Sequence, residues 1–375
     1  MRTFCTEGPV DPKLYYYVPR TALIAEGLKK VEQWRYFTIF APRQSGKTTY
    51  FQFLIEAIKR EKPDWLPVWV SFEAYGDIEL SYFLSSLRDR ILRGTELPEE
   101  TVLDFYNMDD IALKLREVAR FQKKEWVIIV DEIEGLKNLK VLNGFLHLIR
   151  SIYHEKQAIG LRSVILTGVS NITGIIQDTA SPFNIADQIQ VPYFTREEVY
   201  DLLAQHERET GQLFENPVKE GIYEQTLGQP GLVNALARDL VEKECPNGEN
   251  IELRSLYTTL DDFTEYYIDK NIANIIAKAK LYPKTVEEIL FEEPLPFKIT
   301  QEDIGVLYAN GVIDRDPEGN CYIPVPIYKK ALYHHFKPKT NGERRHFKSP
   351  IETYKKYLDE RGLLDVTKLL WRYIA

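Results

Sequence analysis

Residues 41–48, with the sequence APRQSGKT, constrain the fold of this chain most strongly because of the segments on either side of them. The residues before them, 35–40, are rich in β-branched and aromatic side chains, which is typical of a strand. The residues after them, 50–60, carry apolar side chains at helical spacing. The sequence therefore predicts a loop between a strand and a helix, which is the context that a phosphate-binding GxxxxGK[ST] loop requires.

The chemistry of a phosphate chain explains why these residue types occur together. Its dense negative charge needs convergent backbone N–H groups, the positive end of a helix and a flexible cation. We expect Gly46 to let the backbone approach, Lys47 to reach the β- and γ-phosphates, and Thr48 to offer its hydroxyl to Mg²⁺. The residues predicted to bind nucleotide here are Pro42, Arg43, Gln44, Ser45, Gly46, Lys47, Thr48 and Thr49.

One departure weakens the loop pattern taken alone, and the pattern has one alternative interpretation. Ala41 replaces the first glycine of the pattern. An ordinary Ser-Gly turn that caps a helix beside a solvated lysine is the alternative interpretation. The flanking strand and helix favour the phosphate-binding loop.

Other strand-like segments alternate with helical segments along the first half of the chain. This alternation predicts an α/β fold, a parallel sheet sandwiched by helices. The predicted strands are residues 35–40, 67–72, 125–130, 163–167 and 187–191. The predicted helices between them include residues 78–92, 109–121 and 139–153.

Asp131 and Glu132 end the apolar strand at 125–130. The carboxyl edge of a parallel sheet is where such folds collect ligands. We expect Asp131 to orient Mg²⁺ or its waters and Glu132 to polarise an attacking water, because phosphoryl transfer needs positioning and charge neutralisation. Taken alone, an Asp-Glu pair after a strand is more often a solvated turn or a helix cap.

The end of the strand at 163–167 offers further polar groups. Thr167, Ser170 and Asn171 are candidates to sense the γ-phosphate or to hold the water, and Thr167 and Ser170 are the two that we predict as catalytic. Ordinary loop chemistry is the alternative, since Ser, Asn and Gly are common in turns.

After residue 193 the pattern changes to helices alone, beginning with a capping box from Thr195 to Glu198. Further on, residues 316–319 supply a turn between two short strands, and helices followed by such a hairpin suggest a winged helix. Pro230 must begin a helix because it cannot lie inside one. The predicted domains are an ATPase core at 14–194, a helical lid at 195–270, a winged helix at 271–336 and a basic helical tail at 337–375.

Composition narrows the function classes. The chain carries 48 Lys and Arg against 56 Asp and Glu, so its net charge of −8 provides no general attraction for nucleic acid or anionic membranes. The three cysteines are far apart and without CxxC spacing, which argues against disulfides and zinc. With no targeting segment and no apolar run long enough to span a membrane, we expect a cytoplasmic protein.

Five elements in order resemble the AAA-like P-loop ATPases of bacteria and archaea, close to the signal-transducing STAND branch. The elements are YYYVPR at 15–20, APRQSGKTT, VIIVDEIEGL, TGVSNITG followed by SPFNIADQI, and GQPGLV at 228–233. The resemblance implies ATP and Mg²⁺ as ligands. It also implies that Tyr17, Val18 and Arg20 pack against the base, and that Gly228 and Pro230 contact adenine from the other side. A plain helix break is the alternative for the latter pair.

The resemblance leaves three functions to compare. The first is an ATPase that works as a nucleotide-driven switch, and the second is an ATP-regulated winged-helix protein that binds DNA without significant turnover. The third, a small-molecule kinase, would lack the long helical additions. Residues 300–311 are acidic and contain no Arg or Lys, which disfavours DNA.

Partners follow from the same resemblance. Several relatives continue into a PD-(D/E)xK nuclease-like domain, which we do not expect in these 375 residues. The winged helix and the tail are then candidate contacts for a protein partner or a separate effector nuclease. For the tail, a truncated linker and a solvated helix are the alternatives, and base rates favour the solvated helix. The arginine finger stays open among Arg43, Arg150, Arg162 and Arg196.

Overall fold

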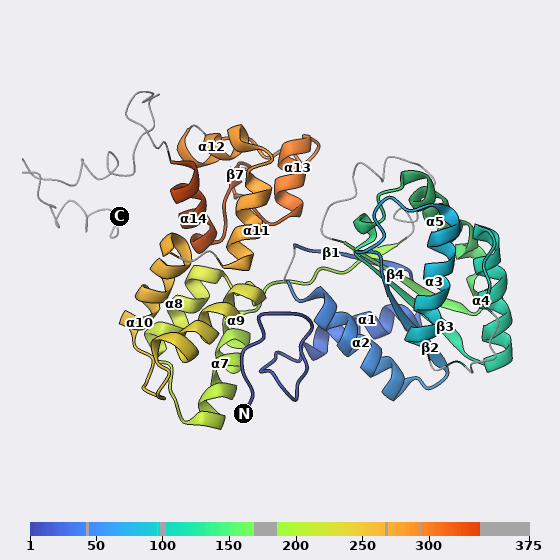
Figure 1. The fold of residues 1–375 in the computed structure, drawn as a ribbon, viewed down its shortest axis with the longest axis horizontal. Coiled ribbons are helices and arrows are strands. Elements are labelled where there is room, and N and C mark those ends of the chain that lie inside the picture. Colours follow the sequence, from blue (N-terminus) through green and yellow to red (C-terminus); the bar gives the residue numbers. More distant parts are fainter. Residues whose placement is uncertain are drawn as a thin grey trace, which may run out of the picture.

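A parallel five-stranded sheet forms one half of the molecule in the computed structural model, which describes residues 1–42, 45–95, 97, 103–168, 186–266, 269–292 and 294–337 (Figure 1). The strand order is β2-β3-β4-β1-β5, and every pairing is parallel. The strands are β1 (Phe37–Phe40), β2 (Trp65–Ser71), β3 (Glu125–Asp131), β4 (Leu161–Gly168) and β5 (Asp187–Gln188). The predicted α/β sheet is confirmed.

Helices cover both faces of this sheet. Residues of β3 alternate between the two faces, with Val127 and Ile129 in one apolar cluster and Ile128 and Val130 in the other. All four are buried, which explains why a parallel strand reads as a continuous apolar run. The first cluster includes α1 (Thr21–Glu32) and α2 (Lys47–Glu61); the second includes α3 (Leu80–Gly94), α4 (Met108–Gln122) and α5 (Leu139–Ser151).

The fifth strand is shorter than the apolar pattern predicts. Only Asp187 and Gln188 pair with β1, whereas Ile189 and Val191 are buried against the same sheet without belonging to a strand. Apolar periodicity reports burial, and here burial continues beyond regular pairing. Helix α1 was not predicted from the sequence.

The second half of the molecule is mostly helical. The predicted capping box at Thr195 and Glu198 is present, and Pro230 is the first residue of its helix. The helices are α7 (Arg196–Thr210), α8 (Asn216–Thr226), α9 (Pro230–Asp239), α10 (Leu253–Asp261), α11 (Lys270–Ala279), α12 (Pro283–Phe291), α13 (Glu302–Ala309) and α14 (Pro326–Phe336). A two-stranded antiparallel hairpin, β6 (Asp314–Arg315) and β7 (Cys321–Tyr322), lies between α13 and α14.

One hydrophobic core unites this helical half. Buried side chains from α7, α8 and α9 belong to the same cluster as those from α11, α13 and α14, and α14 packs against both α8 and α11. Phe4 and Tyr16, from the start of the chain, complete this core. The N-terminal segment therefore packs with the helical half, although the sheet half follows it in sequence (Figure 1).

Gly228, which lies between α8 and α9, packs closely against the backbone of Phe194, just before α7. Its φ is +74°, and its carbonyl accepts a 2.8 Å hydrogen bond from the Phe194 N–H. A Cβ at this position would fall on the Phe194 carbonyl oxygen. Glycine is required here both by the left-handed backbone and by the close approach.

We expect Gly228→Ala to lower the free energy of unfolding by more than the ~1–3 kcal/mol of a left-handed alanine alone, because backbone atoms must also move apart. Urea unfolding would measure the loss. Gly211→Ala is the matched control, since Gly211 has a φ of +79° but open space around its Cβ position. Equal losses in the two variants would show that the approach to Phe194 carries no cost.

Candidate functional site

A cavity of about 580 Å³ lies between the two halves of the molecule. This volume is within the range of pockets that take small-molecule ligands and cofactors. The sheet half contributes residues 45–49, Asp131 and Glu132, and the helical half contributes Pro230 and Asn234. Two N-terminal stretches, residues 5–10 and 16–20, form further wall. The cavity therefore brings together groups from parts of the chain that are far apart in sequence.

The loop after β1 leads directly into α2, as the sequence predicts. Gly46 is the N-cap of α2 with a φ of +89°, and the first turn of α2, whose N–H groups have no carbonyl partner within the helix, lies beside the cavity. Lys47 is 8% exposed, and its Nζ donates to the carbonyl oxygens of Ala41 at 2.6 Å and Pro42 at 3.0 Å. The Ser45 hydroxyl is buried without a hydrogen-bond partner among the described residues. These donors fit an anion at the start of α2.

Asp131 is the last residue of β3 and is 3% exposed. Its Oδ1 accepts hydrogen bonds from the Glu132 N–H at 2.9 Å and the Thr167 hydroxyl at 3.3 Å. Burial raises the pKa of the Asp131 carboxyl above its usual value, and the nearby Lys47 charge only partly offsets this. A buried carboxylate of this kind is better accommodated when a cation lies close to it.

Glu132 and Thr167 both donate to Asp131, but of these two only Glu132 is among the described residues that line the cavity. Glu132 lines the cavity, and its φ of +51° is unusual for a non-glycine residue. Thr167 is fully buried and is not among the described residues that line the cavity. In this structure Thr167 therefore orients the Asp131 carboxylate rather than facing the cavity.

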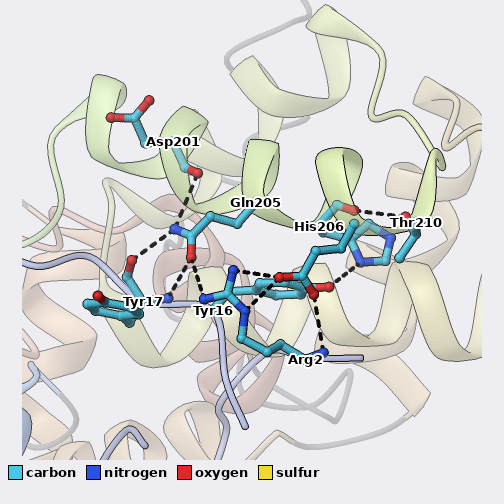
Figure 2. A network of polar contacts seen from close by, with 8 residues as sticks. Arg2, Tyr16, Tyr17, Asp201, Gln205, His206 and Thr210 are labelled. Atoms are coloured by element: carbon cyan, nitrogen blue, oxygen red, sulfur yellow. Dashed lines mark hydrogen bonds and ion pairs between the residues drawn. The ribbon is translucent and has the colours of Figure 1, made fainter. Parts of the chain in front are cut away.

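Residues of the YYYVPR segment line the cavity as a group, and Tyr17 lies with its ring 5.5 Å from that of Phe53 on α2. The Tyr17 backbone exchanges hydrogen bonds with the Gln205 amide of α7 (Figure 2). Val18 lines the cavity too and packs against the helical core.

Arg20 lines the cavity but is held by protein groups. Its guanidinium donates to the Pro192 carbonyl at 2.7 Å and to Glu198 at 3.3 Å, and it lies over the Phe194 ring. Burial lowers the pKa of Arg20, and Glu198 opposes that shift. Arg20 thus connects the start of α1 to the start of α7.

The two lid residues predicted from GQPGLV lie differently. Pro230 lines the cavity, whereas Gly228 is not among its described lining residues and packs on Phe194 instead. Three other predicted site residues, Arg43, Gln44 and Ser170, lie outside the described residues, as does Asn171.

Sequence reasoning missed several residues that line the cavity. They are residues 5–10, Glu73 after β2, Asn234 on α9, and Lys270 and Asn274 on α11. Gly8-Pro9 was the only local signal in the first stretch, and it indicates no more than a turn. The others are single polar residues whose place depends on tertiary packing.

The donor set is compatible with Mg²⁺. No group of three or more His, Cys, Asp or Glu side chains gathers within the part of the chain that the structure describes. Mg²⁺ is usually held by one or two carboxylates together with substrate phosphates and waters, so Asp131 with the Thr48 hydroxyl fits this pattern. A separate finding is that no helix among the described ranges is long and apolar enough to cross a membrane.

The sheet order, the loop before α2 and the cavity at the carboxyl edge of the sheet define the P-loop ATPase class of fold. A family model described as the AAA-like domain matches residues 5–330, and the chain belongs to this family. No curated protein matches the sequence.

One solved structure in particular shares the architecture. A Walker-type ATPase from Pyrococcus abyssi superposes with a TM-score of 0.64 at 15% identity, covering 88% of this chain and 99% of that one. Cdc6p from Pyrobaculum aerophilum gives a TM-score of 0.48 at 13% identity, covering 85% of this chain and 95% of that one. At such identities the likeness concerns the fold.

The raised pKa of Asp131 predicts how the stability of the fold depends on pH. Because the folded pKa lies above the value of about 3.9 in an unfolded chain, ionising Asp131 costs folding free energy. That cost is absent below the unfolded pKa and is complete above the folded pKa. We therefore expect nucleotide-free Asp131→Asn to melt at a higher temperature than the wild type at neutral pH, with the gain shrinking toward pH ~4. Melting curves across pH would test this, and a pH-independent difference would contradict it.

Proposed function

We propose that this protein is a Mg²⁺-dependent ATPase that works as a nucleotide-driven conformational switch. The observation that carries the proposal is the single cavity in which the loop before α2, Asp131, Glu132 and Pro230 meet. Phosphate-binding groups belong to the sheet half, and the lid proline belongs to the helical half. A ligand that contacts both halves supplies the differential affinity that a switch requires.

The phosphates of ATP belong, in this proposal, at the start of α2. Lys47 exchanges the carbonyls of Ala41 and Pro42 for phosphate oxygens, and the N–H groups in the first turn of α2 face the same charge. Thr48 and Asp131 hold Mg²⁺, which neutralises charge on the phosphates when bound. Thr167 keeps the Asp131 carboxylate in place.

Glu132 is the proposed general base. It follows directly after Asp131, it lines the cavity, and its backbone N–H is fixed by the Asp131 carboxylate. This arrangement suits a side chain that orients a water and accepts its proton. The base of ATP would lie between the Tyr17 and Val18 side of the cavity and Pro230 on the lid.

We also propose that α11 to α14 with the β6-β7 hairpin act as a winged-helix module that senses the phosphate loop. Gly311, in the turn after α13, lies against Pro42: a Cβ built on Gly311 would be 2.8 Å from the Pro42 Cγ. The Pro42 carbonyl in turn accepts a hydrogen bond from Lys47. If Lys47 moves toward phosphate, the Pro42 carbonyl loses a hydrogen bond. A resulting shift of Pro42 would then displace Gly311 and the module to which it belongs.

DNA is a weaker candidate partner for that module. The sequence of α13 contains Glu302 and Asp303 in its first turn and no Lys or Arg. Such a surface repels phosphates rather than binding them. A protein partner suits it better, and no observation on the described residues favours DNA.

The roles assigned to Lys47 and Glu132 predict that one variant loses ATP binding and the other loses ATP turnover. Lys47→Ala should weaken ATP binding by about 10- to 100-fold, because a charge-assisted contact of about 1.5–3 kcal/mol is lost. Glu132→Gln should keep binding but lower turnover by about 10²- to 10⁴-fold. Calorimetry and phosphate release with Mg²⁺ would measure the two effects. Equal turnover in wild type and Glu132→Gln would remove the general base from the proposal.

The switch assignment predicts that Gly311→Ala changes nucleotide turnover and affinity while the protein stays folded. The added methyl group must displace Pro42 or push the module away. Gly319→Ala is the matched control: Gly319 also has a positive φ, of +89°, but its Cβ position has no neighbour closer than 3.6 Å. If the two variants change turnover equally, the contact with Pro42 plays no part.

A further inference from the structure

The first ten residues of the chain are attached firmly to the helical half. Phe4 is buried in the helical core, where its ring contacts those of Tyr16, His206 and Phe214. Arg2 donates to Glu209 at 2.8 Å and lies over the Tyr16 ring (Figure 2). These contacts hold the start of the chain on α7.

Residues 5–10, which we call the strap, then cross the cavity wall. The Cys5 N–H donates to the Asn234 Oδ1 at 3.2 Å, and the Asn234 amide donates to the Pro230 carbonyl at 2.8 Å. Asn234 is 7% exposed, so both of its bonds are shielded from water. Asn234 thus joins the strap to the lid proline.

Two side chains add lid-side attachments to the strap. Thr6 accepts a hydrogen bond from Arg238 on α9, and Glu7 pairs with Lys270 at the start of α11. The pair between Glu7 and Lys270 is exposed, so it contributes orientation more than stability.

The far end of the strap contacts the sheet half. The Val10 N–H donates to the Thr49 hydroxyl at 3.4 Å, which is the one hydrogen bond between residues 1–10 and the sheet half within the described chain. Thr49 is in the first turn of α2, next to Thr48. Among the described residues, the strap is therefore held by polar contacts of Cys5, Thr6 and Glu7 on the helical side and by one long hydrogen bond on the phosphate-binding side.

We propose that the strap ties the lid to the start of α2 and thereby slows nucleotide exchange. The inference rests on the proposed function, because it assigns the cavity to a nucleotide. When the lid moves away from the sheet, the strap moves with it, since its attachments to the helical half are more numerous and partly buried. The bond from Val10 to Thr49 is then the one that breaks, and its strength sets how readily the cavity opens.

The experiment removes that single donor. Val10→Pro lacks the N–H, and Val10→Ala, the matched control, keeps it. Each variant is loaded with a fluorescent ATP analogue and chased with excess ATP, and the dissociation rate is followed in a stopped-flow instrument. Loss of one net hydrogen bond predicts dissociation on the order of fivefold faster for Val10→Pro. Val10→Ala should match the wild type.

A second variant covers the case in which proline disturbs folding. Thr6→Val removes the hydroxyl that accepts from Arg238 and keeps the shape of the side chain. It loosens the strap from the lid, so the lid can move away while Val10 stays bonded to Thr49, and faster dissociation is again expected. Wild-type dissociation rates in both Val10→Pro and Thr6→Val, in folded proteins that still bind the analogue, would overturn the strap and leave the proposed ATPase standing. Failure of the wild type to bind in a Lys47-dependent manner would overturn both.

Discussion

The ammonium group of Lys47 is the interaction on which the site depends. It is buried, so it must be surrounded by acceptors, and the loop supplies two backbone carbonyls. Those carbonyls belong to Ala41 and Pro42, and the latter residue also bears the contact with Gly311. The same positive charge partly offsets the burial of Asp131. One cation therefore links the two loop carbonyls, reduces the cost of burying the carboxylate, and lies one residue contact away from the turn at Gly311.

The sequence predicted the sheet half well because its signals are local. A continuous apolar run can only be satisfied by burial on both faces, and an octapeptide between a strand and a helix has few alternative structures. Pro230 begins a helix for a reason contained in its own ring. The predicted helix starting at Thr195 has an equally local cause in its capping box. Asp131 and Glu132 reach the cavity because they follow such a strand.

The rest of the site depends on contacts between residues far apart in sequence. Residues 5–10 carry no motif, and the Cys5 contact with Asn234 spans 229 residues through a backbone donor that every residue type shares. Gly228 is a glycine because of the Phe194 backbone, and no local pattern contains that information. Thr167 faces Asp131 because β3 and β4 are neighbours in the sheet. Such facts become visible only when segments that are distant in sequence have been packed against each other.

The continuous helical core limits which parts of the molecule can move relative to one another. Residues on both sides of the boundary predicted at 270 and 271 share one buried cluster, so separating lid from C-terminal module would expose apolar surface. The least costly motion keeps α7 to α14 together and moves them relative to the sheet. The contact between Gly311 and Pro42 and the wall formed by Pro230 then change in the same step.

The burial of Phe4 in that core also has a consequence for the order in which parts of the protein fold. This residue leaves the ribosome before any of the sheet, yet its partners on α7 and the segment after it appear about two hundred positions later, as the separation of 207 residues between Arg2 and Glu209 illustrates. Closing so long a loop is slow, and domains generally fold as units in the order of synthesis. The sheet therefore assembles before the first ten residues can dock, and their docking onto α7, α9 and the start of α11 is a late event in folding.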